Sequence, residues 1–132
     1  MEHQSLAARV ATGVARRDPG QLSALLTTTV RLRALLPAGP IEAQGRENVA
    51  SLLCALVADF DTVEVVALAG EAVGDRLLVH YRLRLGQGAI RWVCTQTAVC
   101  TPADGRIKVI NLLCSGFREI EDDGDLRSTS AA

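Results

Sequence analysis

The second half of the chain, from residue 62 to residue 119, has the pattern of four long strands joined by tight turns. Gly74-Asp75, Gly86-Gln87-Gly88 and Pro102-Ala103-Asp104-Gly105 separate runs that are rich in β-branched and apolar residues. Such spacing is typical of successive hairpins, so the pattern predicts an antiparallel meander. One face of the meander must be buried, and the first half of the chain has to supply the cover.

The first half of the chain has helical patterns. Leu6, Val10 and Val14 recur at the helical period, which predicts a helix from about Ser5 to Arg17. Asp18-Pro19 can cap and begin a short second helix. We expect an extended segment at 27–30, a loop at 37–40 around Pro37, Gly39 and Pro40, and a third helix from Gly45 to near Asp59.

Helices followed by a meander define an α+β fold. We expect a cone-shaped, curved antiparallel sheet of four to six strands, covered on its concave face by three N-terminal helices. The chain has 132 residues, of which 48% are hydrophobic, and this is enough for one core. We therefore predict a single domain over residues 1–120, followed by an acidic, solvated tail over residues 121–132.

Charge and composition exclude several functions. Fourteen basic and fifteen acidic residues give a net charge of −1, and only four residues are aromatic, so we expect no nucleic-acid partner. No apolar run is long enough to span a bilayer, so we expect no membrane contact and a cytoplasmic location. The cysteines, at positions 54, 94, 100 and 114, form no C-x-x-C pair. We therefore expect no metal and no cofactor.

Alternation along the strand at 76–85 assigns its two faces. The odd-numbered residues Leu77 to Leu85, including Tyr81, are apolar and should face the helices, while His80, Arg82 and Arg84 should face away. We extend this assignment through the turns. If the Gly86–Gly88 turn pairs Tyr81 with Val93, and the next turn pairs Val99 with Val109, two opposite residue sets follow.

The first set would line a pocket for a small apolar or amphipathic molecule, because a few polar groups among apolar ones are typical of ligand sites. It consists of Tyr81, Val93, Thr95, Thr97, Asn111 and Leu113. The second set would form the outer sheet face and the interface of a homodimer. It consists of His80, Arg82, Trp92, Cys94, Ile110 and Leu112. In this register His80, Cys94 and Cys114 also meet; we interpret the cysteines as structural fillers.

The order of two helices, a loop, a glycine-led third helix (Gly45-Arg46-Glu47-Asn48-Val49) and a closing hairpin resembles the nuclear transport factor 2-like superfamily, in its SnoaL-like or ketosteroid-isomerase-like branch. The last strand, from Asp104-Gly105-Arg106 through Cys114-Ser115-Gly116-Phe117-Arg118, carries most of the likeness, which extends from about Ser5 to Ile120. The resemblance implies a cone with an apolar pocket and dimers formed through the outer sheet face. It allows isomerases, dehydratases, epoxide hydrolases, polyketide cyclases and non-catalytic modules.

Ketosteroid isomerases use a tyrosine, a general-base aspartate and a protonated aspartate. By the resemblance, these positions fall at Gly13, within Leu32–Leu36 and at Thr97, and none of them carries the required group. Glu42 or Glu47 could instead reach the pocket mouth.

Three hypotheses remain. An open pocket without a carboxylate favours a binding module, an open pocket with a carboxylate favours an isomerase, lyase or hydrolase, and a filled interior favours a pure association domain.

Overall fold

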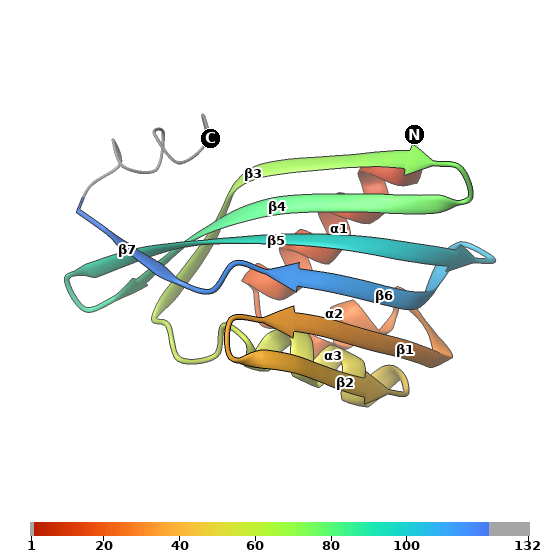
Figure 1. The fold of residues 1–132 in the computed structure, drawn as a ribbon, viewed down its shortest axis with the longest axis horizontal. Helices are drawn as coiled ribbons and strands as arrows, with labels where there is room; N and C mark the ends of the chain where they lie inside the picture. Colours follow the sequence, from red (N-terminus) through yellow and green to blue (C-terminus); the bar gives the residue numbers. More distant parts are fainter. Residues whose placement is uncertain (1, 122–132) are drawn as a thin grey trace.

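The structure is a computed structural model, and it describes residues 2–121. A seven-stranded sheet has the order β2-β1-β6-β5-β4-β3, and β7 pairs with β5 (Figure 1). All three helices lie behind this sheet in the view of Figure 1. The elements are α1 (Glu2–Ala15), α2 (Pro19–Ser23), β1 (Leu26–Leu36), β2 (Gly39–Gln44), α3 (Arg46–Ala55), β3 (Thr62–Val73), β4 (Arg76–Gln87), β5 (Ile90–Ala103), β6 (Arg106–Cys114) and β7 (Arg118–Ile120).

The α+β class and the three helices agree with the expectation, whereas the sheet has seven strands where four to six were expected. Residues 37–40 do not form the expected loop, because β2 begins at Gly39 and pairs with β1 across Pro37-Ala38. The expected last strand is divided into β6 and β7. The tail expected at residues 121–132 lies outside the described residues, except for Glu121.

The first two helices are joined tightly. Asp18 caps α2, because its Oδ1 accepts a hydrogen bond from the backbone N–H of Gln21 at 3.1 Å, and Pro19 occupies the first turn. A Cβ added at Gly13 of α1 would lie only 2.7 Å from Cδ2 of Leu22. Gly13 therefore allows α2 to pack directly on α1.

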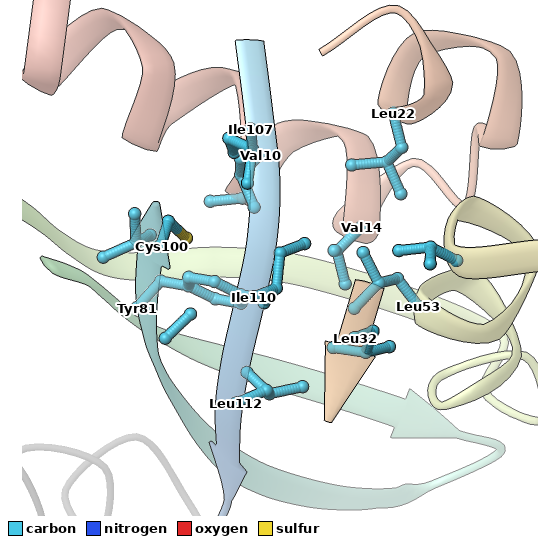
Figure 2. Packing of buried hydrophobic residues seen from close by; sticks show 14 of the residues in the cluster. Val10, Val14, Leu22, Leu32, Leu53, Tyr81, Cys100, Ile107, Ile110 and Leu112 are labelled. Carbon is cyan, nitrogen blue, oxygen red and sulfur yellow. The ribbon is translucent and has the colours of Figure 1, made fainter. Parts of the chain in front are cut away.

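The interior between helices and sheet is apolar. Val10 and Val14 of α1, Leu22 of α2 and Leu53 of α3 pack toward the sheet, as Figure 2 shows. Leu32 of β1, Tyr81 of β4, and Cys100, Ile107, Ile110 and Leu112 of β5 and β6 meet them from the other side.

The turns of the meander set the register of the strands. Gln87 pairs with Ile90, so the turn between β4 and β5 has two residues, Gly88 and Ala89, and Gly88 has a φ of 60°. Ala103 pairs with Arg106 around Asp104-Gly105, whose φ angles of 54° and 79° are those of a type I′ hairpin turn. The register shifts between Thr101 and Pro102, just before that turn.

These turns correct the predicted face assignment. The inward side of β4 is as expected, since Leu77, Val79, Tyr81, Leu83 and Leu85 are all buried. However, Tyr81 pairs with Gln96, not with Val93, which is a shift of three residues. Because strand faces alternate with a period of two, an odd shift exchanges the two faces of β5, and β6 follows β5.

Candidate functional site

A hydrogen-bonded polar pair lies inside the cone. The Tyr81 hydroxyl donates to Oε1 of Gln96 at 2.5 Å, and Gln96 is completely buried. The Gln96 amide in turn donates through Nε2 to Sγ of Cys114 at 3.6 Å. Burial raises the pKa of the Tyr81 phenol well above its ordinary value, so this group stays neutral.

The space around Tyr81 is nearly filled. The cavity between the helices and the sheet has a volume of about 10 Å³, and its lining includes Val10, Leu53, Tyr81, Cys100 and Ile110. A water molecule needs a comparable volume, and small-molecule sites typically measure about 300 to 1,000 Å³. No carboxylate lines this cavity within residues 2–121. The interior is therefore a packed core with one internal polar pair.

Most of the predicted pocket residues lie on the outer face. Tyr81 is inside, as expected, but Asn111 and Leu113 are exposed and Thr97 is half-buried on the side away from the helices. Thr95 and Val93 share the parity of Thr97, so they also face away from the helices. The predicted pocket of Tyr81, Val93, Thr95, Thr97, Asn111 and Leu113 is therefore corrected to Tyr81 alone, because of the odd register shift.

The predicted interface set divides in the same way. His80 and Arg82 lie on the outer face, as expected, where Nδ1 of His80 lies 2.7 Å from Thr97 Oγ1 and Arg82 Nε donates to Thr95 Oγ1 at 3.1 Å. The other four members, Trp92, Cys94, Ile110 and Leu112, face the interior. Trp92 contacts Phe60 there in an edge-to-face arrangement.

At the positions that the resemblance assigned to the isomerase machinery, no tyrosine or carboxylate is present. Gly13 packs against Leu22, and Thr97 faces away from the interior. Arg33 of the 32–36 stretch is exposed on β1 and forms a 3.5 Å ion pair with Glu42. Glu47 is exposed on α3. Neither of the two candidate carboxylates lines the interior cavity.

Hollows open at the surface instead, and two of them adjoin the ends of the meander strands. A recess of about 340 Å³ lies between α1 and the turn ends of the β3–β4 and β5–β6 hairpins; its lining includes Leu6, Arg9, Ala72, Leu77 and Pro102. A cleft of about 490 Å³ lies where β6 ends. The residues lining the cleft are Leu36, Pro37, Ala38, Leu56, Cys114, Ser115, Gly116 and Phe117.

The family of the chain follows from comparison with known domains. The sequence profile of the SnoaL-like domain family matches residues 7–110, most of the described fold. The chain belongs to the SnoaL-like domain family. This places the SnoaL-like domain described here in the nuclear transport factor 2-like superfamily, as its element order indicated. No curated protein matches the sequence at a significant level.

Solved structures share the fold of this SnoaL-like domain at low sequence identity. A hypothetical protein of Catenulispora acidiphila with a ketosteroid isomerase-like fold, in complex with trimethylamine, is 15% identical, with a TM-score of 0.69 and coverage of 83% of this chain and 85% of that one. A proposed polyketide cyclase of Xanthomonas campestris is 18% identical, with a TM-score of 0.65 and coverage of 85% and 89%. An epoxide hydrolase of M. tuberculosis is 18% identical, with a TM-score of 0.61 and coverage of 86% and 83%.

The outer face of the SnoaL-like domain carries two side-by-side rows of residues that cross the sheet from β1 to β3. The central row contains Leu35, Leu113, Thr97, His80 and Ala69, and the neighbouring row contains Arg33, Asn111, Val99, Leu78 and Glu71. Leu35, Leu113 and Val99 are 53%, 55% and 41% exposed. The central row contains apolar or uncharged side chains and the imidazole of His80. The neighbouring row carries a basic residue, Arg33, on β1 and an acidic residue, Glu71, on β3.

Neither a metal centre nor a membrane span is present among residues 2–121. No cluster of three or more His, Cys, Asp or Glu side chains occurs in this range. None of its helices is long and apolar enough to cross a bilayer. Sequence patterns did not identify Gln96 or the cleft at Cys114, because glutamine is usually exposed and the cleft depends on how distant turns pack.

Proposed function

We propose that this SnoaL-like domain is a non-catalytic association module that pairs with a second copy of itself through the outer sheet face. The observation that carries the proposal is the filled interior, whose cavity of about 10 Å³ has no room for a substrate and no carboxylate. A general acid or base would need such a group next to the reacting atoms. Binding energy has to come from the surface, where Leu35, Val99 and Leu113 are exposed.

The charges of the neighbouring row favour a second copy as the occupant. Glu71 lies on β3, and Arg33 lies on β1, where its exposed 3.5 Å ion pair with Glu42 of β2 leaves it able to contact a second acidic partner. A two-fold axis that lies in the interface and runs parallel to the strands exchanges the two ends of the row. It therefore places Arg33 opposite Glu71 of the second copy, twice per dimer, and brings the two apolar centres together.

The size of the face suits this partner. Five strands at the usual spacing, each with about four outward-facing residues, cover roughly 24 Å by 26 Å. This is on the order of 600 Å², without the extra area that protruding side chains add. A stable interface buries about 800 Å² per partner, so the face is close to what a dimer needs. Mixed apolar and polar composition with opposite charges at the margins is common in such interfaces.

Sedimentation equilibrium of the full chain tests the proposal. We expect a mass of twice 14.0 kDa. Leu113→Arg should give monomers, because it places a charge in the apolar centre of each face, and Ile90→Arg should leave the dimer intact. Ile90 is a matched control, since it is 44% exposed beside the β4–β5 turn and belongs to neither row.

A charge exchange makes the test specific for the two-fold arrangement. Arg33→Glu alone should weaken the dimer through like charges, and Arg33→Glu combined with Glu71→Arg should restore it. A wild-type chain that stays monomeric at about 100 μM, a concentration at which even weak dimers form, would overturn the proposal. A double variant whose dimer is no tighter than that of Arg33→Glu alone would overturn it as well.

A second candidate function is the binding of a small amphipathic acid in the recess beside α1. Its volume of about 340 Å³ and its largely apolar lining suit a short acyl chain. Arg9 is exposed at the rim and has no ion-pair partner in the part of the chain that the structure describes, whereas Arg76 is held by Asp75 at 2.7 Å. The Arg9 guanidinium is therefore available to a carboxylate.

Native mass spectrometry with octanoate, and with octylamine as the control of opposite charge, tests this candidate. We expect one octanoate per chain and no octylamine, and we expect Arg9→Gln to abolish the adduct. Equal retention of both compounds would exclude a carboxylate site at Arg9. The same spectra report the number of subunits.

A further inference from the structure

Two of the four cysteines meet at one end of the interior. Cys94 of β5 and Cys114, the last residue of β6, have their Sγ atoms 3.6 Å apart, within hydrogen-bond range for sulfur. Both side chains face the helices, because the buried Gln96 pairs with Cys114 and Cys94 lies two residues before Gln96 on β5. The contact depends on the observed register and does not involve His80, which lies on the other face.

The surroundings distinguish the two sulfur atoms. The pKa of the Cys114 thiol is lowered, first by the hydrogen bond from Cys94, and also by hydrogen bonds from the Gly116 backbone and the Gln96 side chain, against the opposing effect of burial. The pKa of Cys94 is raised by its hydrogen bond to Cys114 and by burial. The hydrogen bonds that converge on Cys114 favour it as the thiolate of the pair, with Cys94 as the thiol that donates to it.

Tyr81 fixes the direction of the amide that faces Cys114. Its hydroxyl donates to Oε1 of Gln96, which leaves the Nε2 group directed at Cys114 Sγ. Together with the Cys94 thiol and the Gly116 backbone N–H, this amide makes three donors that converge on one sulfur. A buried cysteine that served only as filler would need none of them.

Cys114 is also reachable from outside. It lines the cleft of about 490 Å³ together with Leu56, Pro37 and Phe117, among others. Residues 115–117 belong to no strand, and Gly116 has a φ of 80°. A Cβ at Gly116 would lie 2.7 Å from Cγ of Pro37, so the glycine allows the chain to pass close to the β1–β2 turn beside the sulfur.

From this geometry we propose that Cys94 and Cys114 form an oxidisable dithiol that reacts with small hydroperoxides entering through the cleft. The Cys114 thiolate attacks the terminal oxygen of the hydroperoxide, the O–O bond breaks, and the alkoxide or hydroxide leaves and takes up a proton. Cys114 is thereby oxidised to the sulfenic acid. Cys94 then attacks the Cys114 sulfur, water leaves, and a disulfide forms. In total, two thiols and one hydroperoxide give one disulfide, one alcohol or water, and one further water.

Closing the disulfide requires a movement that the fold permits. The sulfur atoms have to approach from 3.6 Å to about 2.05 Å, the length of an S–S bond. The two residues are diagonal across β5 and β6, which is further apart than a directly opposed pair. Cys114 is the last residue of β6, so a shift of the chain after it leaves the β6 ladder intact and has to stretch only the two bonds between Ser115 and Thr95, each 2.9 Å long.

The experiment uses the reduced full chain, titrated with hydrogen peroxide, alkylated under denaturing conditions and mapped by peptide mass spectrometry without reduction. We expect loss of the mass of two hydrogen atoms per chain and a single crosslinked peptide that joins Cys94 to Cys114. Cys94→Ser should stop the reaction at a Cys114 sulfenic acid that dimedone traps. Cys100→Ser is the matched control, because burial raises the pKa of Cys100 to about 12, and it should form the same disulfide as the wild type.

A second measurement needs no variant. In the untreated chain, iodoacetamide should modify Cys114 at pH 7 at least about ten times faster than Cys100, since Cys114 lines the cleft and its pKa is lowered, whereas burial raises the pKa of Cys100. Oxidation that appears first at Cys54 or Cys100 would overturn the proposal. Disulfides between chains, or equal alkylation of all four cysteines, would overturn it as well. The outcome is independent of whether the outer face forms a dimer.

Discussion

Removing the Tyr81 hydroxyl should cost more stability than its small size suggests. In Tyr81→Phe, Oε1 of Gln96 loses its partner at a site where Gln96 is 0% exposed. Leaving such a group unsatisfied costs about 1–3 kcal/mol, because water cannot replace the lost donor. We expect a loss of about 2 kcal/mol in the free energy of unfolding, a large part of the stability of a domain this size.

Removing the Gln96 amide instead should cost a similar amount of stability, whereas removing both polar groups together should cost less. Gln96→Leu leaves the Tyr81 hydroxyl unsatisfied and should also cost about 2 kcal/mol. The double variant removes both polar groups, so its cost should be under about 1 kcal/mol, and the coupling between the two positions should be about 3 kcal/mol. Few other perturbations of this core would give a double variant more stable than either single one.

Urea denaturation followed by the fluorescence of Trp92, the one tryptophan of the sequence, measures these energies. Ser23→Ala is the control, because it removes a hydroxyl that donates to the Gly20 carbonyl at 3.1 Å at an exposed site on α2, where water can take its place. It should cost less than about 0.5 kcal/mol. If Tyr81→Phe were equally mild, or if the double variant lost the sum of both single losses, the interior hydrogen bond would not stabilise the fold as argued.

Three further predictions concern the titration and the helices. Burial raises the pKa of Tyr81 from its usual value near 10, so the stability it contributes is complete below that pH and is lost as the pH rises above it. The chain has one tyrosine, so tyrosinate absorbance during an alkaline titration should appear only together with the loss of circular dichroism. Gly13→Ala should lower the free energy of unfolding by about 1–3 kcal/mol, because its Cβ would meet Leu22 at 2.7 Å, whereas Gly20→Ala, with 3.4 Å to its nearest neighbour, should be nearly neutral in thermal melts. Asp18→Ala should cost about 1 kcal/mol in the same melts through loss of the α2 cap, and Asp18→Asn should recover most of it.

Local patterns predicted the elements of the meander well. The strand expected at 62–73 and the turn Gly74-Asp75 agree with β3 and with the pairing of Val73 and Arg76. Turn residues act within a few positions of themselves, so their signal is readable without knowledge of the rest of the fold. The inward face of β4 was readable for the same reason, because apolar and polar residues alternate along it.

Pairings between distant segments had no comparable signal. β2 follows β1 across Pro37-Ala38, and β1 runs parallel to β6, with Leu35 next to Leu113. A parallel contact between the start and the end of a chain leaves no turn to recognise. The division of the last strand at Ser115–Phe117 likewise depends on packing against Pro37.

The face of β5 was mispredicted because neither the length of the preceding turn nor the burial pattern of the strand decides it. One extra residue in a turn exchanges the faces of every following strand, and the Gly86–Gly88 sequence allows more than one turn length. Burial would normally decide, but Thr95 and Thr97 suit either side of a sheet, as Cys94 does, and Gln96 favours the outside. Gln96 can lie inside only because Tyr81 and Cys114 satisfy its amide. The interior position of Gln96 therefore makes sense only after its partners, from two other strands, are already in place.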